Sequence, residues 1–197
     1  MKEQQKKYEL TDEFIEHWSG KKLYRIRALV AFGFVMAGQL GGFVESEKNL
    51  DQSLSGNAWV YGNAWVYGNA RVYGNAEVYG NARVYGNARV SGNARVSGNA
   101  WVFGDAEVSG NAWVRSCAVI SERKMIFWAS NVGSENGTLT VFNGKNGLIV
   151  TRGCFVGTVD EFLAKSAKAH DDKTKNEYKL LIEVAKSRIL GVKDERN

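Results

Sequence analysis

The sequence predicts a mainly β protein built around a parallel β-helix with a triangular cross-section. A tandem repeat is the first reason: ten consecutive six-residue units start at Gly56, the first GNAWVY and the last GNAWVR, and a decayed eleventh unit, SCAVIS, ends at Ser121. The second is the Ala-x-Val alternation in each unit, which is the two-residue period of a strand. The third is composition, because 22 glycines without any proline indicate a backbone that turns at fixed, repeated positions.

Each repeat is expected to form one short strand and one corner. The alanine and the valine point inward, and the valines recur at every sixth residue from Val60 to Val114. The Gly-Asn pair turns the corner, because both residues tolerate the positive φ that other residues resist. Three repeats per turn give a coil of 18 residues. Residues one turn apart then stack at the spacing of neighbouring strands, about 4.8 Å.

This register sorts the outward side chains into columns on three faces. The residues before each valine give one column per face: Trp65, Arg83 and Trp101; Trp59, Glu77, Arg95 and Trp113; and Arg71, Arg89 and Glu107. The residues after the valine add a column of Tyr67, Tyr85 and Phe103 beside the first. We expect a guanidinium between two indoles in the first column and an ion pair in the second. The adjacent arginines of the third repel each other unless an anion or an acidic partner intervenes.

The chain divides into four units. We assign residues 1–55 to an N-terminal β cap, 56–121 to the β-helix, 122–157 to a β-meander and 158–197 to a helical hairpin. The cap is needed because an open solenoid end exposes unpaired backbone and an apolar cross-section.

Within the cap, Leu23–Val30 alternates apolar and basic residues, which predicts a half-buried strand over the first coil. The glycines Gly38, Gly41 and Gly42 predict tight turns that lead into the cap. Their spacing does not match that of a phosphate-binding loop.

The C-terminal units are predicted from turns, caps and one apolar stripe. Asparagine-glycine pairs separate three apolar runs into a meander. Thr158 and Thr174 each precede a glutamate by three residues, which predicts a capping box at the start of each helix. Gly191 is expected to end the second helix. That helix carries one apolar stripe, Tyr178, Leu181, Ile182, Ala185 and Ile189.

Charge and composition exclude several classes of partner. The net charge of +5 is spread thinly, so no basic arm for nucleic acid is present. The N-terminus lacks the apolar core of a signal peptide, and no run is long enough to span a membrane. Cys117 and Cys154 are the only cysteines and form no metal-binding pair. A soluble protein of a reducing cytoplasm fits these features.

The repeat A-x-V-x-G-N resembles the hexapeptide signature of left-handed β-helix proteins, which implies a left-handed coil and a trimer. The whole chain also resembles a family of bacteriophage and prophage proteins. That resemblance is carried by Leu23–Gly33, Ala37–Leu50, the GNAxVYG array and Gly153–Lys165. It implies the bacterial host cytoplasm as the site of action, and it implies no chemistry.

No enzymatic activity, cofactor or metal is expected. The acyltransferases that share such coils use a histidine base, whereas the array contains no histidine, and His17 and His170 both lie in flanking units. Two histidines are too few for a three-histidine zinc site. A Cys154–His170 pair is the remaining catalytic candidate. We instead expect Cys154, in an apolar strand, to be a small buried residue.

The outward aromatic and arginine residues are the predicted functional surface. So many exposed rings favour coverage by another subunit or a ligand, although a mechanical spacer is an alternative. The predicted ligand-binding residues are Arg71 and Arg89, with Arg83 and Arg95 near the corners of their face, and Trp65 and Trp101. The predicted interface residues are Tyr61, Tyr67, Tyr79, Tyr85, Phe103, Tyr178 and Leu181.

We therefore expect a non-enzymatic homotrimer of a phage or prophage that acts as a binding or scaffold module. Its partner would be a host defence protein that it inhibits, or an anionic nucleotide that it sequesters. The alternative is a virion-associated structural protein of the tail or spike.

Overall fold

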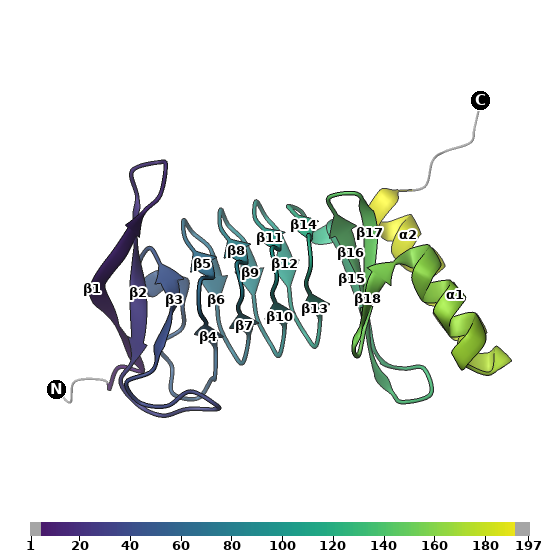
Figure 1. Ribbon diagram of the computed structural model, residues 1–197, viewed down its shortest axis with the longest axis horizontal. Coiled ribbons are helices and arrows are strands. Elements are labelled where there is room, and N and C mark those ends of the chain that lie inside the picture. The colour runs from purple at the N-terminus through teal and green to yellow at the C-terminus, as the bar shows by residue number, and fades with distance from the viewer. Residues whose placement is uncertain (1–4, 192–197) are drawn as a thin grey trace.

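The computed structural model of the chain describes residues 5–191 and confirms the predicted fold class. The protein is elongated, with an N-terminal β unit, a parallel β-solenoid, and a C-terminal sheet with two helices arranged in a row (Figure 1). No helix within residues 5–191 has the length and apolar character needed to cross a membrane.

The repeats form eleven strands of two residues each, three per turn. These strands are β4 (Trp59–Val60), β5 (Trp65–Val66), β6 (Arg71–Val72), β7 (Glu77–Val78), β8 (Arg83–Val84), β9 (Arg89–Val90), β10 (Arg95–Val96), β11 (Trp101–Val102), β12 (Glu107–Val108), β13 (Trp113–Val114) and β14 (Val119–Ile120).

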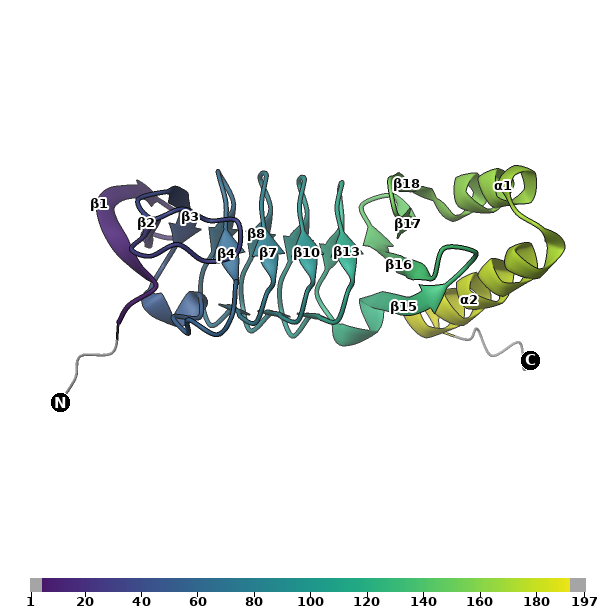
Figure 2. The same cartoon turned by 90° about the horizontal axis from the view of Figure 1, so that it is seen from below.

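Three parallel sheets result, and we name each after its first repeat strand. The β4 face runs β4-β7-β10-β13, the β5 face runs β5-β8-β11-β14, and the β6 face runs β6-β9-β12. Trp65 pairs with Arg83, and Arg83 with Trp101, which confirms the predicted coil length. The repeated alanines and valines fill the interior and are all buried. Figure 2 shows the coils as a row of loops between the two flanking units.

The corners of the coil differ from the prediction in one respect. Within each Gly-Asn pair the glycine alone takes the positive φ, between 57° and 71° from Gly62 to Gly110. The asparagines instead stack their side-chain amides along the corners. Asn69 Nδ2 donates to Asn87 Oδ1 at 3.1 Å, and Asn87 Nδ2 donates to Asp105 Oδ1 at 3.0 Å. Asp105 ends this ladder, because an ionised carboxylate accepts hydrogen bonds but cannot donate one onward.

The N-terminal unit joins the solenoid through its own strand. β1 (Tyr8–Glu16) and β2 (Lys22–Ala28) form an antiparallel hairpin, β2 pairs with β3 (Leu40–Val44), and β3 pairs in parallel with β5. A short 3₁₀ helix, η1 (Glu47–Asn49), follows β3. The coil therefore starts at β3, before the first repeat at Gly56.

The predicted role of Gly41 and Gly42 as turn residues is wrong, because both lie in β3. A Cβ on Gly41 would come within 2.5 Å of Ile26 Cγ1, and one on Gly42 within 2.6 Å of the Ala64 carbonyl oxygen. These glycines let β3 pack closely over the first coil. Of the three glycines predicted to form turns, only Gly38, with φ of 83°, takes a turn conformation.

The C-terminal unit is a four-stranded antiparallel sheet covered by two helices. It follows a short 3₁₀ helix, η2 (Arg123–Met125). The strands are β15 (Ile126–Val132), β16 (Gly137–Gly144), β17 (Gly147–Arg152) and β18 (Phe155–Thr158), and the helices are α1 (Val159–Ala169) and α2 (Asp172–Leu190).

The helix caps confirm two predictions and correct one. Thr158 Oγ1 accepts from the Glu161 backbone N–H at 3.3 Å, completing the predicted capping box. Gly191 caps the end of α2 as expected. The start of α2 is capped by Asp171 and not by Thr174, since the Thr174 N–H donates to Asp171 Oδ1 at 2.9 Å. The carboxylate of Asp171, three residues upstream, competes successfully because it is the stronger acceptor.

Candidate functional site

The β5 face carries a column of alternating rings and guanidinium groups. The Arg83 guanidinium lies 4.4 Å from the Trp65 ring and 5.5 Å from the Trp101 ring, as the register predicts. The column continues beyond the repeats, because Phe43 pairs with Trp65 and the Arg25 guanidinium lies 4.2 Å from the Phe43 ring. Sequence reasoning missed Arg25 and Phe43 because neither belongs to a repeat.

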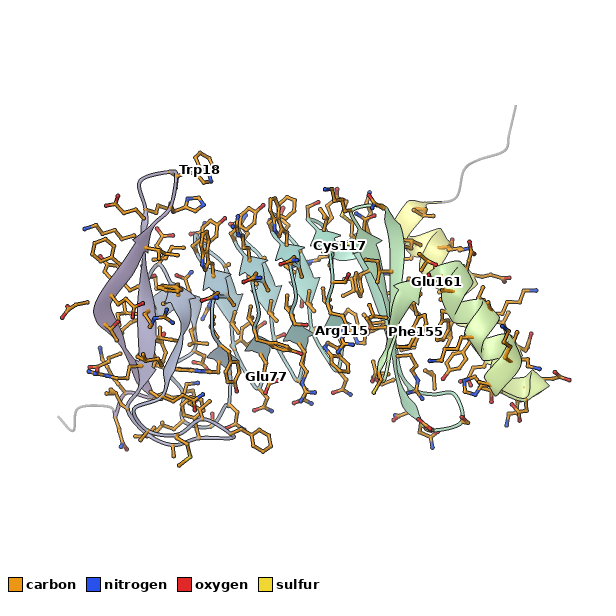
Figure 3. The ribbon with its side chains drawn as sticks, viewed as in Figure 1. Trp18, Glu77, Arg115, Cys117, Phe155 and Glu161 are labelled. Atoms are coloured by element: carbon orange, nitrogen blue, oxygen red, sulfur yellow. The ribbon has the colours of Figure 1, made fainter. Side chains whose placement is uncertain are left out.

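A second column of stacked rings runs beside the first. Ring centroids are 5.0 Å apart both from Tyr67 to Tyr85 and from Tyr85 to Phe103, with interplanar angles of 3° and 5°. His17 lies 4.9 Å from Tyr67 at the N-terminal end. Burial raises the pKa of the Tyr67 and Tyr85 hydroxyls. Beyond them, Trp18 extends from the β1–β2 loop, 90% exposed (Figure 3).

The stacking decides which part of each ring faces a partner. Both faces of Tyr85 are covered by its neighbours, and the strand spacing leaves no room for a further ring between them. The column therefore presents ring edges and phenol hydroxyls. Such a surface suits a protein partner, because tyrosine, tryptophan and arginine are enriched at protein interfaces. It does not suit a planar ligand that intercalates.

The N-terminal end of the β4 face is covered by the chain itself. Trp59, predicted to be exposed, is fully buried between Tyr8 and Phe32, with ring centroids 6.0 Å and 5.4 Å away. The expected ion pair is present, with Arg95 Nε 3.0 Å from Glu77 Oε2.

The distal part of the β4 face forms a second small cluster. Trp113 Nε1 donates to Tyr79 Oη at 3.2 Å, and the Arg115 guanidinium lies 3.9 Å from the Trp113 ring. Tyr61 packs against the core. The predicted interface tyrosines Tyr61 and Tyr79 are thus only partly available.

The β6 face brings Arg71 and Arg89 side by side, both exposed. Neither forms an ion pair within residues 5–191. Glu107, the next residue in the column, pairs instead with Arg123 at 3.3 Å.

The expectation that Arg83 and Arg95 extend this arginine face is wrong. Arg83 lies on the β5 face between its two tryptophans, and Arg95 lies on the β4 face beside Glu77. Each pairs within its own column, one turn away, so the predicted ligand-binding residues are divided among three faces.

Two predicted interface residues belong to the C-terminal core. Tyr178 is buried and its hydroxyl accepts from Arg152 Nε at 3.1 Å, while Leu181 packs half-buried in the same cluster. The prediction that Tyr178 lies at an interface is therefore wrong. The stripe is covered by the sheet of its own chain, and the exposed apolar residues of α2 are Leu180, Val184 and Leu190.

The repeats are similar to the YdcK β-solenoid repeat. Three overlapping segments match that family model, residues 64–80, 76–91 and 88–104. The match includes Trp65, Arg83 and Trp101 and stops short of both flanking units, which identifies a β-solenoid repeat protein without placing the whole chain. A comparison with curated proteins finds no match.

Cys154 and His170 lie in the C-terminal unit, outside the solenoid faces. Within residues 5–191 no group of three histidine, cysteine or acidic side chains could hold a metal ion. The prediction that Cys154 is buried in a strand is wrong. Cys154 is exposed in the turn between β17 and β18, because the apolar run is interrupted at Gly153, whose φ is 54°.

Proposed function

We propose that this protein is a non-enzymatic binding or scaffold module that uses the β5 face to hold a protein partner. The observation that carries the proposal is the pair of columns on that face, where cations and aromatic rings are fixed in place by a rigid coil. The chain's resemblance to bacteriophage and prophage proteins supports an accessory role in the host cytoplasm, with a host defence protein as the partner.

The physical support lies in preorganisation. Arg83 is held between Trp65 and Trp101, so little side-chain entropy is lost when a partner covers it. Trp101 remains 44% exposed, and tryptophan and arginine are the residue types that dominate binding energy at interfaces. The alternative occupant of the same rings is a second copy of the chain, in a homotrimer.

Arg71 and Arg89 support a second candidate function, the sequestration of an anionic nucleotide on the β6 face. Their paired exposure on neighbouring strands favours an anion that relieves their repulsion. The alternative of a virion-associated structural protein has no comparable feature of the surface in its favour.

Native mass spectrometry of the protein purified from phage-infected cells tests these functions together. We expect an assembly heavier than the 21.8 kDa chain, with a host protein retained. The double variant Trp18→Ala/Trp101→Ala should lose the partner. The control Phe34→Ala/Met36→Ala, which removes exposed side chains elsewhere, should keep it.

The second candidate is tested by Arg71→Ala/Arg89→Ala, which should leave the protein partner bound and abolish retention of a nucleotide. A bare monomer, or a partner retained equally by all variants, would contradict the β5-face proposal. Recovery of the protein from purified virus particles would favour the alternative of a virion-associated structural protein.

A further inference from the structure

A cavity of about 280 Å³ lies in the C-terminal unit, and none of its lining residues belongs to a solenoid face. It is lined by the β15–β16 turn, the β17–β18 turn, α1 and Tyr178 of α2, and it is open to solvent. Phe155, labelled in Figure 3 where the sheet meets α1, forms part of its wall. The volume is near the lower end of the range for small-molecule sites.

The cavity lining carries more positive than negative charge. Arg152 and Lys165 are its cations, His170 adds an imidazole, and Glu135 is its single carboxylate. Glu135 is mostly exposed and lies 4.0 Å from Arg152 Nη1, so it neutralises the guanidinium only weakly.

Arg152 is held in a fixed position. Its Nε donates to Tyr178 Oη at 3.1 Å and its Nη2 donates to the Val132 carbonyl oxygen at 3.4 Å. The side chain is largely withdrawn from solvent. A guanidinium fixed in this way is prepared for an oxyanion, because its planar fork matches carboxylate and phosphate oxygens.

Ser166 provides an independent indication of a ligand. It lines the same cavity from α1, is only 3% exposed, and its hydroxyl has no hydrogen-bond partner. Leaving a buried hydroxyl unpaired is costly, and buried polar groups normally have a partner. A ligand oxygen in the cavity would supply that partner.

We propose that this cavity binds a small oxyanion, a carboxylate or phosphate group on a compact molecule. Arg152 and Lys165 provide the charge, Ser166 donates a hydrogen bond, and His170 closes the site at the end of α1. The site is distinct from the β5 face, so its existence does not depend on the proposed function.

The two cysteines provide a test with an internal control. Cys154 lines the cavity and is exposed, whereas Cys117 is exposed in the last, decayed repeat and does not line it. Alkylation by iodoacetamide, a neutral reagent, is followed at each cysteine by peptide mass spectrometry. Inorganic phosphate or malonate at millimolar concentration and constant ionic strength should slow reaction of Cys154 several-fold and leave Cys117 unchanged.

The two anions separate the possible ligand sources: protection by phosphate alone points to a phosphorylated ligand, and protection by malonate alone points to a carboxylate.

Ser166→Ala and Lys165→Ala should remove most of the protection. Lys168→Ala, an exposed lysine on the same helix outside the lining, should retain it. Lys165 is itself exposed, so its variant folds even if Ser166→Ala does not. The proposal fails if neither anion protects Cys154, if both cysteines slow equally, or if protection survives in both lining variants.

Discussion

At the N-terminal end of the solenoid the buried side chains Lys7 and Asn49 donate hydrogen bonds to the first coil, whereas at the C-terminal end threonine side chains both accept and donate. The ladder explains the difference. Around each strand an N–H of one coil donates to a carbonyl of the next coil, as Trp65 does to Ala82 at 2.9 Å and Tyr67 does to Val84 at 3.0 Å. The first coil therefore presents carbonyls to the cap, whereas in the last coil Trp113 presents both its N–H and its carbonyl.

The N-terminal cap supplies strong donors. Lys7 Nζ donates to the carbonyl oxygens of Gly56 and Ala58, both at 3.3 Å. Asn49 Nδ2 donates to those of Gly68 and Ala70 at 3.0 Å and 2.9 Å. Lys7 covers the β4 face and Asn49 covers the β6 face. The backbone of β3 covers the β5 face.

The C-terminal cap uses groups that can accept. Thr140 Oγ1 accepts from the Trp113 N–H at 3.1 Å, and Thr151 Oγ1 donates to the Trp113 carbonyl oxygen at 2.6 Å. Met125 Sδ accepts from the Ser121 N–H at 3.4 Å. A hydroxyl serves here because it can both accept and donate. The last coil is thus closed by acceptors and donors together, whereas Lys7 and Asn49 serve the first coil as donors.

Lys7→Met should give the largest loss of stability. Lys7 is 0% exposed, and the variant keeps the apolar stem while leaving two buried carbonyls without a donor, at about 1–3 kcal/mol each. We expect a loss of at least about 2 kcal/mol in the free energy of unfolding, measured by urea denaturation. The neighbouring Lys6→Ala removes only an exposed pair with Glu47 and should cost less than about 1 kcal/mol. Equal losses would show that Lys7 is no cap.

Thr140→Val should have an intermediate effect at the opposite end. Valine matches threonine in shape but cannot accept the Trp113 N–H, and the expected cost is about 1–2 kcal/mol. Thr138→Val is the control, because its hydroxyl contacts only Ser130 Oγ near the surface. A Thr140 variant as stable as this control would refute the requirement for an acceptor at the C-terminal end.

Glu45→Gln should have the smallest effect, and that effect should depend on pH. Burial tends to raise the pKa of the Glu45 carboxyl, but hydrogen bonds from Lys21 Nζ and the Gly68 N–H outweigh it and hold the pKa below 4.5. The folded state therefore resists protonation, and the stability that the carboxylate contributes is present above pH 4.5 and is lost as pH falls through its folded-state pKa. The stability difference between the wild type and the variant should shrink in acid, as measured by denaturation at a series of pH values.

The coil of the repeats could be predicted, because a six-residue repeat with three strands per turn permits one register only. Once Trp65, Arg83 and Trp101 are placed a turn apart, their stacking follows by arithmetic. The ends could not be predicted in this way. Lys7 and Trp59 are ordinary residues in the sequence, and only the packing of the hairpin over the first coil buries both.

The site residues show the same limit. The adjacency of Arg71 and Arg89 followed from the register, whereas the cavity around Cys154 depends on two turns and a helix meeting in space. Its only sequence signal was the occurrence of Cys154 and His170 near one another in the chain. Gly153 could have revealed the exposure of Cys154, because glycine favours a turn within an apolar run.

The three-repeat turn also constrains how a chain of this design can change in length. Duplicating or deleting three repeats together would lengthen or shorten the rod by about 4.8 Å and leave both end units over their original faces. A change of one repeat would rotate the C-terminal unit by a third of a revolution against the N-terminal hairpin. Thr140 would then meet a strand other than β13, and the ring columns would end beneath different neighbours. Natural length variants that keep both end units are therefore expected to differ by multiples of three repeats.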